Sequence, residues 1–217
     1  MHIEQVTIDA DSIALDGALW LPENHIGVVL FASCGGANRV KPPNDYVASV
    51  LRTARLGTLW MELLTPQERS VRDPVADVGV LAGRMHAACE WLRMHQLTRG
   101  SPIGLCGAGH AAAAAMQLAA GQGVRIAAIV ARSGRTDLME AATLTRISAP
   151  TLLIVGGLDD GGIALTRATY AALRCKKRLE IIPGGTHSFE EPGSLEVVAR
   201  LTRSWFLRYA STAERRL

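Results

Sequence analysis

Apolar residues along the chain fall into two patterns that alternate: continuous runs and rows with helical spacing. Continuous runs are typical of strands covered on both faces, and rows spaced by three and four residues are typical of helices that bury one face. The runs lie at residues 26–32, 58–63, 102–106, 126–131, 151–155 and 179–182. The helical rows lie at residues 45–53, 77–95, 111–120, 163–173 and 195–209. This alternation predicts an α/β fold with a mostly parallel central sheet and helices on both faces.

The beginning of the chain follows a different pattern. Residues 6–8 and 13–21 alternate polar and apolar positions around a turn at 9–12, which predicts an antiparallel hairpin. The polar segment 65–74, with Arg69, Arg72 and two prolines, is expected to be a surface loop. No repeat, linker or low-complexity stretch interrupts the pattern, so residues 1–217 are expected to form one domain without a large lid.

Composition and charge exclude several classes of protein. The net charge is only +3 and no basic run is interleaved with aromatic residues, so we expect no nucleic-acid partner. No apolar run reaches the roughly 18 residues of a membrane span, and residues 1–10 lack the pattern of a signal peptide. We therefore expect a cytoplasmic protein with no membrane partner, and a homodimer is compatible with the sequence.

The cysteines indicate neither a disulfide framework nor a metal site. There are four of them, Cys34, Cys89, Cys106 and Cys175. Their spacing matches no zinc pattern and no CxxC redox pair. In a reducing compartment such cysteines are usually small core residues. The sequence therefore predicts no metal and no other cofactor.

Candidate chemistry lies where the predicted strands end, because open parallel sheets bind ligands beyond the carboxyl ends of their strands. The run Gly107-Ala108-Gly109-His110-Ala111 follows a buried strand and opens an alanine-rich helix. This is the context of a nucleophile elbow, G-x-S-x-G, whose small residues let strand and helix approach closely. Gly109 takes the serine position, so the position that should carry the nucleophile has no side chain.

Two further strand ends carry an acid and a histidine. Asp159 follows the strand at 151–155, and His187 follows the last strand. An elbow, an acid and a histidine in this chain order match an α/β-hydrolase triad, in which the acid orients the imidazole. We therefore predict that Asp159 and His187 form an acid–histidine pair.

The chain resembles the dienelactone-hydrolase-like branch of the α/β-hydrolases over almost its whole length. The resemblance is carried by residues 27–32, 63–65, 131–138 and 149–159, and most specifically by Pro-Gly-Gly-Thr-His-Ser-Phe-Glu-Glu-Pro-Gly at 183–193. It implies an α/β-hydrolase fold, with Asp159 as the triad acid and His187 as the triad base. It also implies hydrolysis of small esters and lactones.

The departures from this family fall at the chemistry. Relatives read Gly-Ala-Ser-Thr-Gly at the elbow, and they read His-Gly-Ser-Gly where this chain has Ser33-Cys34-Gly35-Gly36. That loop and the residue after the nucleophile normally lend backbone N–H groups to an oxyanion hole. In this chain the corresponding groups belong to Cys34 and His110.

Gly109 cannot form an acyl-enzyme, and four interpretations follow. In the first, Asp159 and His187 are a general-base dyad that acts on water or on an acidic substrate group. In the second, Cys34 is a displaced nucleophile paired with His187. In the third, the chain is a non-catalytic pseudo-hydrolase that binds a small ligand or a partner protein. In the fourth, Cys34, His110, His187 and Asp159 bind a metal ion, although their spacing matches no recognised pattern.

Three other residues are candidates for substrate contact. Ser33, Arg39 and Arg135 follow predicted strand ends, and for the two arginines a structural ion pair is the alternative role. The function we predict is a small-molecule enzyme of the dienelactone-hydrolase-like family, acting on an ester, lactone or related carbonyl substrate. It would use Asp159 and His187 without the usual serine nucleophile.

Overall fold

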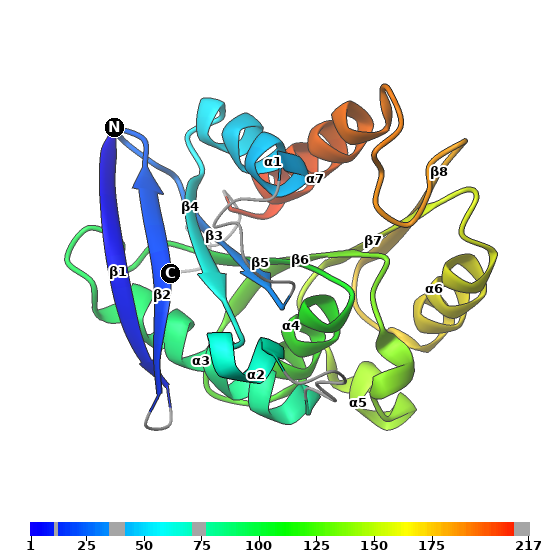
Figure 1. The fold of residues 1–217 in the computed structure, drawn as a ribbon, viewed down its shortest axis with the longest axis horizontal. Helices are drawn as coiled ribbons and strands as arrows, with labels where there is room; N and C mark the ends of the chain where they lie inside the picture. Colours follow the sequence, from blue (N-terminus) through cyan, green and yellow to red (C-terminus); the bar gives the residue numbers. More distant parts are fainter. Residues whose placement is uncertain (11–12, 35–41, 71–76, 211–217) are drawn as a thin grey trace.

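A single sheet forms the centre of the fold (Figure 1). The computed structural model describes residues 1–10, 13–34, 42–70 and 77–210. Within these ranges eight strands lie in the order β1-β2-β4-β3-β5-β6-β7-β8. Their bounds are β1 His2–Ala10, β2 Ile13–Leu21, β3 Val28–Ser33, β4 Gly57–Glu62, β5 Ile103–Ala108, β6 Ile126–Arg132, β7 Thr151–Gly156 and β8 Lys177–Ile182. The β1–β2 and β2–β4 pairs are antiparallel and the others are parallel, which confirms the predicted α/β fold.

Helices cover both faces of the sheet, as Figure 1 shows. The helices are α1 Pro42–Thr53, α2 Pro66–Ser70, α3 Val78–Met94, α4 His110–Ala120, α5 Ala141–Arg146, α6 Asp160–Ala172 and α7 Ser194–Ala210, with a 3₁₀ turn η1 at Thr136–Leu138. α1 and α7 contact each other on one face, and α3 to α6 cover the other. Each layer has its own apolar cluster against the sheet, and this two-sided burial explains why the central strands are continuously apolar.

Part of the expected loop at 65–74 is helical, because α2 begins there. Thr65 Oγ1 accepts a hydrogen bond from the Glu68 N–H at 3.2 Å, and Glu68 Oε2 accepts one from the Thr65 N–H at 2.8 Å. This reciprocal arrangement is a capping box, and Pro66 occupies the first helical position that proline favours. The 3₁₀ turn η1 and the short helix α5 were not predicted either, because three to six residues are too few to display a helical period.

The connection from β5 to α4 is the tightest strand-to-helix turn near the site. A Cβ on Gly107 would lie 2.7 Å from backbone atoms of Ala111 and Ala112, so only glycine allows this approach. The alanines that open α4 are all buried, which lets the helix lie close against the sheet and α3. This packing brings the first turn of α4 to the carboxyl edge of β5.

Candidate active site

Gly109 lies between the last residue of β5 and the first residue of α4, in an elbow conformation. Its φ is 55° and its ψ is −122°, a combination that glycine adopts readily and other residues only with strain. The Gly109 N–H donates to the Arg132 carbonyl at 3.2 Å, and the Gly109 carbonyl accepts from the Arg135 N–H at 3.1 Å. These bonds tie the elbow to the end of β6. Apart from Gly109 and its two chain neighbours, no atom of the described residues lies within 4 Å of an ideal Cβ on Gly109.

Asp159 and His187 lie in direct contact, as the sequence predicts. The distance from His187 Nδ1 to Asp159 Oδ2 is 2.8 Å. A carboxylate only accepts hydrogen bonds, so Nδ1 carries the proton and the Nε2 lone pair of the neutral ring is left on the opposite side. The His187 side chain is 62% exposed and the Asp159 side chain is 19% exposed. The imidazole is therefore held on one side and accessible on the other.

Asp159 is also the N-cap of α6. Its Oδ1 accepts a hydrogen bond from the Gly162 N–H at 2.9 Å. The hydrogen bond from His187 lowers the pKa of Asp159, and the Gly162 N–H acts in the same direction against the effect of burial. Both interactions favour the ionised carboxylate, so Asp159 remains charged at neutral pH.

The segment that carries His187 is fastened to the ends of β6 and β7. Ser133 Oγ donates to the His187 carbonyl at 3.1 Å, and the Leu158 N–H donates to the Gly185 carbonyl at 2.9 Å. Ser133 is buried and has a φ of 43°, which few non-glycine residues adopt. Phe189 is also buried, with a φ of 57°. These contacts fix the backbone on both sides of His187.

Cys34 follows β3 at the same edge of the sheet as the elbow. Ala32 pairs with Gly107 across the two strands, so Cys34 and Gly109 each lie two residues beyond a paired position. Burial raises the pKa of the Cys34 thiol to about 12, with Glu62 adding to the shift and Arg84 opposing it. At neutral pH the thiol is therefore protonated, which is unfavourable for a nucleophile.

The other residues predicted to contact a substrate differ in what the structure shows of them. Arg135 makes a forked ion pair with Asp137, with Nε–Oδ1 at 2.9 Å and Nη2–Oδ2 at 2.8 Å, so its guanidinium braces its own loop. Arg135 lowers the pKa of Asp137, and His110 is close enough to act in the same direction. The Ser33 carbonyl accepts from the Leu63 N–H at 2.7 Å. Arg39 lies outside the described residues, as do Gly35 and Gly36.

Within the described ranges, Cys34, His110, Asp159 and His187 do not come together as a group that could hold a metal ion, and no other three histidine, cysteine or acidic residues do so. None of the described helices combines the length and the apolar composition that a membrane crossing requires.

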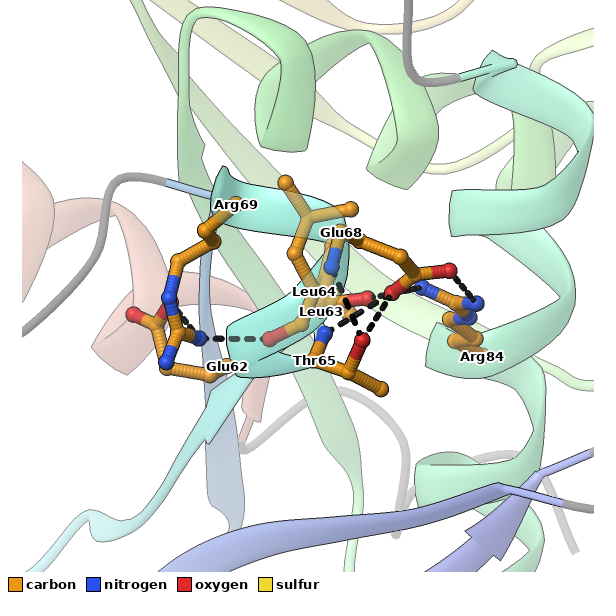
Figure 2. A network of polar contacts seen from close by, with 7 residues as sticks. All are labelled: Glu62, Leu63, Leu64, Thr65, Glu68, Arg69 and Arg84. Atoms are coloured by element: carbon orange, nitrogen blue, oxygen red, sulfur yellow. Dashed lines mark hydrogen bonds and ion pairs between the residues drawn. The ribbon is translucent and has the colours of Figure 1, made fainter. Parts of the chain in front are cut away.

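A polar network that the sequence pattern did not predict lies at the end of β4 (Figure 2). Arg84 projects from α3 onto Glu68, with Nη2–Oε1 at 2.6 Å and Nη1–Oε2 at 2.9 Å, and it also donates to the Leu63 carbonyl. Arg69 donates to the Leu64 carbonyl and lies 3.5 Å from a Glu62 oxygen. The capping-box sequence from Thr65 to Glu68 was the available signal for the acidic partner, whereas nothing in the local pattern pointed to a buried arginine on α3.

No protein-family model matches the chain. Two curated relatives from two strains of Mycobacterium tuberculosis, both named "Putative phosphoribosyl transferase", are 41% identical over 204 residues. The match covers 94% of this chain but 46% of each relative, so the chain spans about half the length of these curated relatives.

Solved structures match the chain over nearly its full length. A dienelactone hydrolase from Anabaena variabilis is 40% identical, with a TM-score of 0.89, and the match covers 96% of this chain and 98% of that one. Est1E from Butyrivibrio proteoclasticus has a TM-score of 0.81 at 15% identity, covering 95% of this chain and 99% of that one, a likeness of fold alone.

Proposed function

Because the chain belongs to the dienelactone hydrolase family of the α/β-hydrolases, we propose that it is a hydrolase-like enzyme acting on a small carbonyl substrate, an ester or a lactone. In this proposal Asp159 and His187 act as a general-base dyad without a serine nucleophile. The observation that carries it is the 2.8 Å contact between His187 Nδ1 and Asp159 Oδ2, made by a histidine side chain that is 62% exposed.

The proposed reaction uses water in place of the missing side chain at Gly109. His187 Nε2 takes a proton from a water molecule while the water oxygen attacks the carbonyl carbon, and Asp159 stabilises the imidazolium that forms. The backbone N–H groups of Cys34 and His110 are the candidate donors to the oxyanion. When the tetrahedral intermediate collapses, the imidazolium returns the proton to the departing alkoxide, which leaves an acid and an alcohol. Beyond its chain neighbours, no atom of the described residues lies within 4 Å of an ideal Cβ on Gly109, which supports a place for the water there.

Two other interpretations have less support. A Cys34 nucleophile would have to ionise from a thiol whose pKa is about 12. The transferase named in the curated relatives describes proteins that this chain matches over 46% of their length, and no feature of the site favours it here. A non-catalytic ligand-binding role is the remaining alternative, and turnover of small esters and lactones distinguishes it from the proposed enzyme.

The test is hydrolysis of a panel of small aryl esters and lactones by the wild type and by His187→Ala. We expect kcat/KM to fall by about 10²-fold or more, because the general base is lost. His86→Ala is the matched control, since His86 is also an exposed histidine beside a carboxylate, Glu90, at 3.8 Å on α3. Absence of turnover by the wild type across the panel, or equal turnover by His187→Ala, would overturn the proposal in favour of the ligand-binding role.

A further inference from the structure

The Asp159 carboxylate has two separate tasks, one for each oxygen. Oδ1 accepts the Gly162 N–H at 2.9 Å and caps α6, and Oδ2 contacts His187 Nδ1 at 2.8 Å. The helix therefore sets the orientation of the carboxylate, because its capping oxygen faces the N–H of Gly162, the third residue of α6. Because the two oxygens belong to one rigid carboxylate, the bond from Oδ1 to the helix also fixes the position of Oδ2, which faces His187.

Gly162 lies so close to this carboxylate that no side chain fits beside it. An ideal Cβ on Gly162 would lie 2.3 Å from Asp159 Oδ2 and 2.8 Å from Oδ1. The atoms in conflict belong to the end of a side chain and not to backbone. A methyl group at Gly162 is therefore expected to displace the carboxylate and leave the helix in place. The displaced oxygen is the one that contacts His187.

The preceding residue, Gly161, provides a contrast within the same turn. An ideal Cβ on Gly161 meets no described atom within 4 Å. Glycine is less favourable than alanine inside a helix, so a methyl group is expected to be tolerated wherever nothing occupies its space. The Asp159 carboxylate occupies that space at Gly162, and no described atom occupies it at Gly161.

We propose that Gly162 is a positioning residue for the Asp159–His187 pair, acting through the space it leaves for the carboxylate and through its N–H. The effect on catalysis rests on the proposed function, whereas the effect on the pair itself does not. Gly162 touches neither substrate nor reacting atoms. Its influence reaches His187 only through Asp159.

The test is ¹⁵N NMR of histidine-labelled protein at neutral pH, which reports whether the neutral His187 ring carries its proton on Nδ1 or on Nε2. The wild type and Gly161→Ala should hold the proton on Nδ1, facing Asp159. Gly162→Ala should lose this preference and approach Asp159→Ala, in which the acceptor is absent. Both glycine variants add the same methyl group to the same turn of α6, so their difference isolates the contact with the carboxylate.

A double-mutant cycle keeps the inference falsifiable if Gly162→Ala alone folds poorly. In an Asp159→Ala background the carboxylate oxygens are gone, so adding Gly162→Ala should cause no further loss of folding stability and should leave the His187 signal unchanged. A destabilisation by Gly162→Ala that persists in this background would overturn the inference, because it would place the conflict in the helix backbone. Retention of the Nδ1 proton in Gly162→Ala would overturn it as well.

Turnover gives a separate readout. If the wild type is active on the ester and lactone panel, kcat/KM should fall by about 10²-fold in Gly162→Ala, as expected for a misplaced catalytic group, and should be unchanged in Gly161→Ala. A wild type without activity would defeat the proposed function while the NMR result still decides the role of Gly162.

Discussion

Two carboxylates at the same edge of the sheet hold their partners in opposite surroundings. Glu68, in the helix after β4, binds Arg84 through both oxygens, at 2.6 and 2.9 Å, and the arginine side chain is 8% exposed. Asp159, after β7, contacts His187 through one oxygen at 2.8 Å, and the imidazole is 62% exposed. One pair is closed to solvent on its cationic side, and the other is open.

If the proposed function holds, the difference separates a structural use of charge from a chemical one. Glu68 also accepts from Thr65, and Arg84 also donates to the Leu63 carbonyl, so this network holds the chain between β4 and α3. Asp159 uses its second oxygen to cap a helix, whereas most of the His187 side chain is exposed. An accessible base can exchange protons with a ligand, and a guanidinium with its hydrogen bonds directed inward cannot.

The largest effect is expected from Asp159→Asn, which should lower kcat/KM by about 10²-fold or more because the charge that supports the imidazolium is lost. The free energy of unfolding should change by less than about 0.5 kcal/mol, because asparagine caps helices as well as aspartate. Steady-state kinetics and urea unfolding measure the two quantities. A large loss of stability with turnover preserved would reverse the roles assigned to the two pairs.

The opposite behaviour is expected from Arg84→Met, which keeps an apolar stem but removes the guanidinium. The free energy of unfolding should fall by about 2 kcal/mol, because Glu68 and the Leu63 carbonyl lose their partner and water can solvate only part of this site. Arg93→Met is the control from the same helix, since Arg93 makes an exposed pair with Glu90. That variant should lose less than about 0.5 kcal/mol in urea unfolding. Equal losses in both variants would show that burial of Arg84 contributes nothing.

The smallest effect is expected from acid titration of the Glu68–Arg84 network. The hydrogen bond from Arg84 lowers the pKa of Glu68 from 4.5 to about 2. Its contribution to stability is therefore complete above about pH 4.5 and is lost as the pH falls toward 2. We expect this ion pair to contribute about 1 kcal/mol to the free energy of unfolding. The contribution is small because the Glu68 side chain is 39% exposed and solvent screens its charge.

Glu68→Gln measures this contribution, because glutamine keeps the capping box and removes the charge. The difference in unfolding free energy between the wild type and Glu68→Gln should shrink between pH 6 and pH 3. A difference that stays constant over this range would mean that the ion pair adds nothing to the hydrogen bonds.

Much of the fold could be predicted from the sequence because it depends on short-range periodicity. Continuous apolar runs identified the buried parallel strands, and the row from Val78 to Leu92 identified the buried face of α3. The elbow around Gly109 was also predictable, because its small residues are a local requirement of the turn between β5 and α4. Helix α2 was missed although its capping box from Thr65 to Glu68 is local, so that signal was present in the sequence.

Some features of the candidate site could likewise be predicted from the sequence, and others could not. The identities and the chain order of Asp159 and His187 were in the sequence, and so was the glycine at position 109 of the elbow. Their contact distance, the raised pKa of Cys34 and the partner of Glu68 were not. Each of these depends on groups from separate elements, such as Glu62 and Arg84 beside Cys34.

By itself, then, the sequence determined the order of the strands and the longer helices along the chain. It also determined the elbow and the candidate acid and base, because local patterns encode backbone shape and chemical type. The tertiary structure alone decided which charges are buried, which ring stays open to solvent and which glycine must remain a glycine. Burial and electrostatics depend on distances between segments that meet only when the chain folds. Asp159 and His187, 28 positions apart in the chain, meet in this way, and Gly162 keeps the space in which they do so.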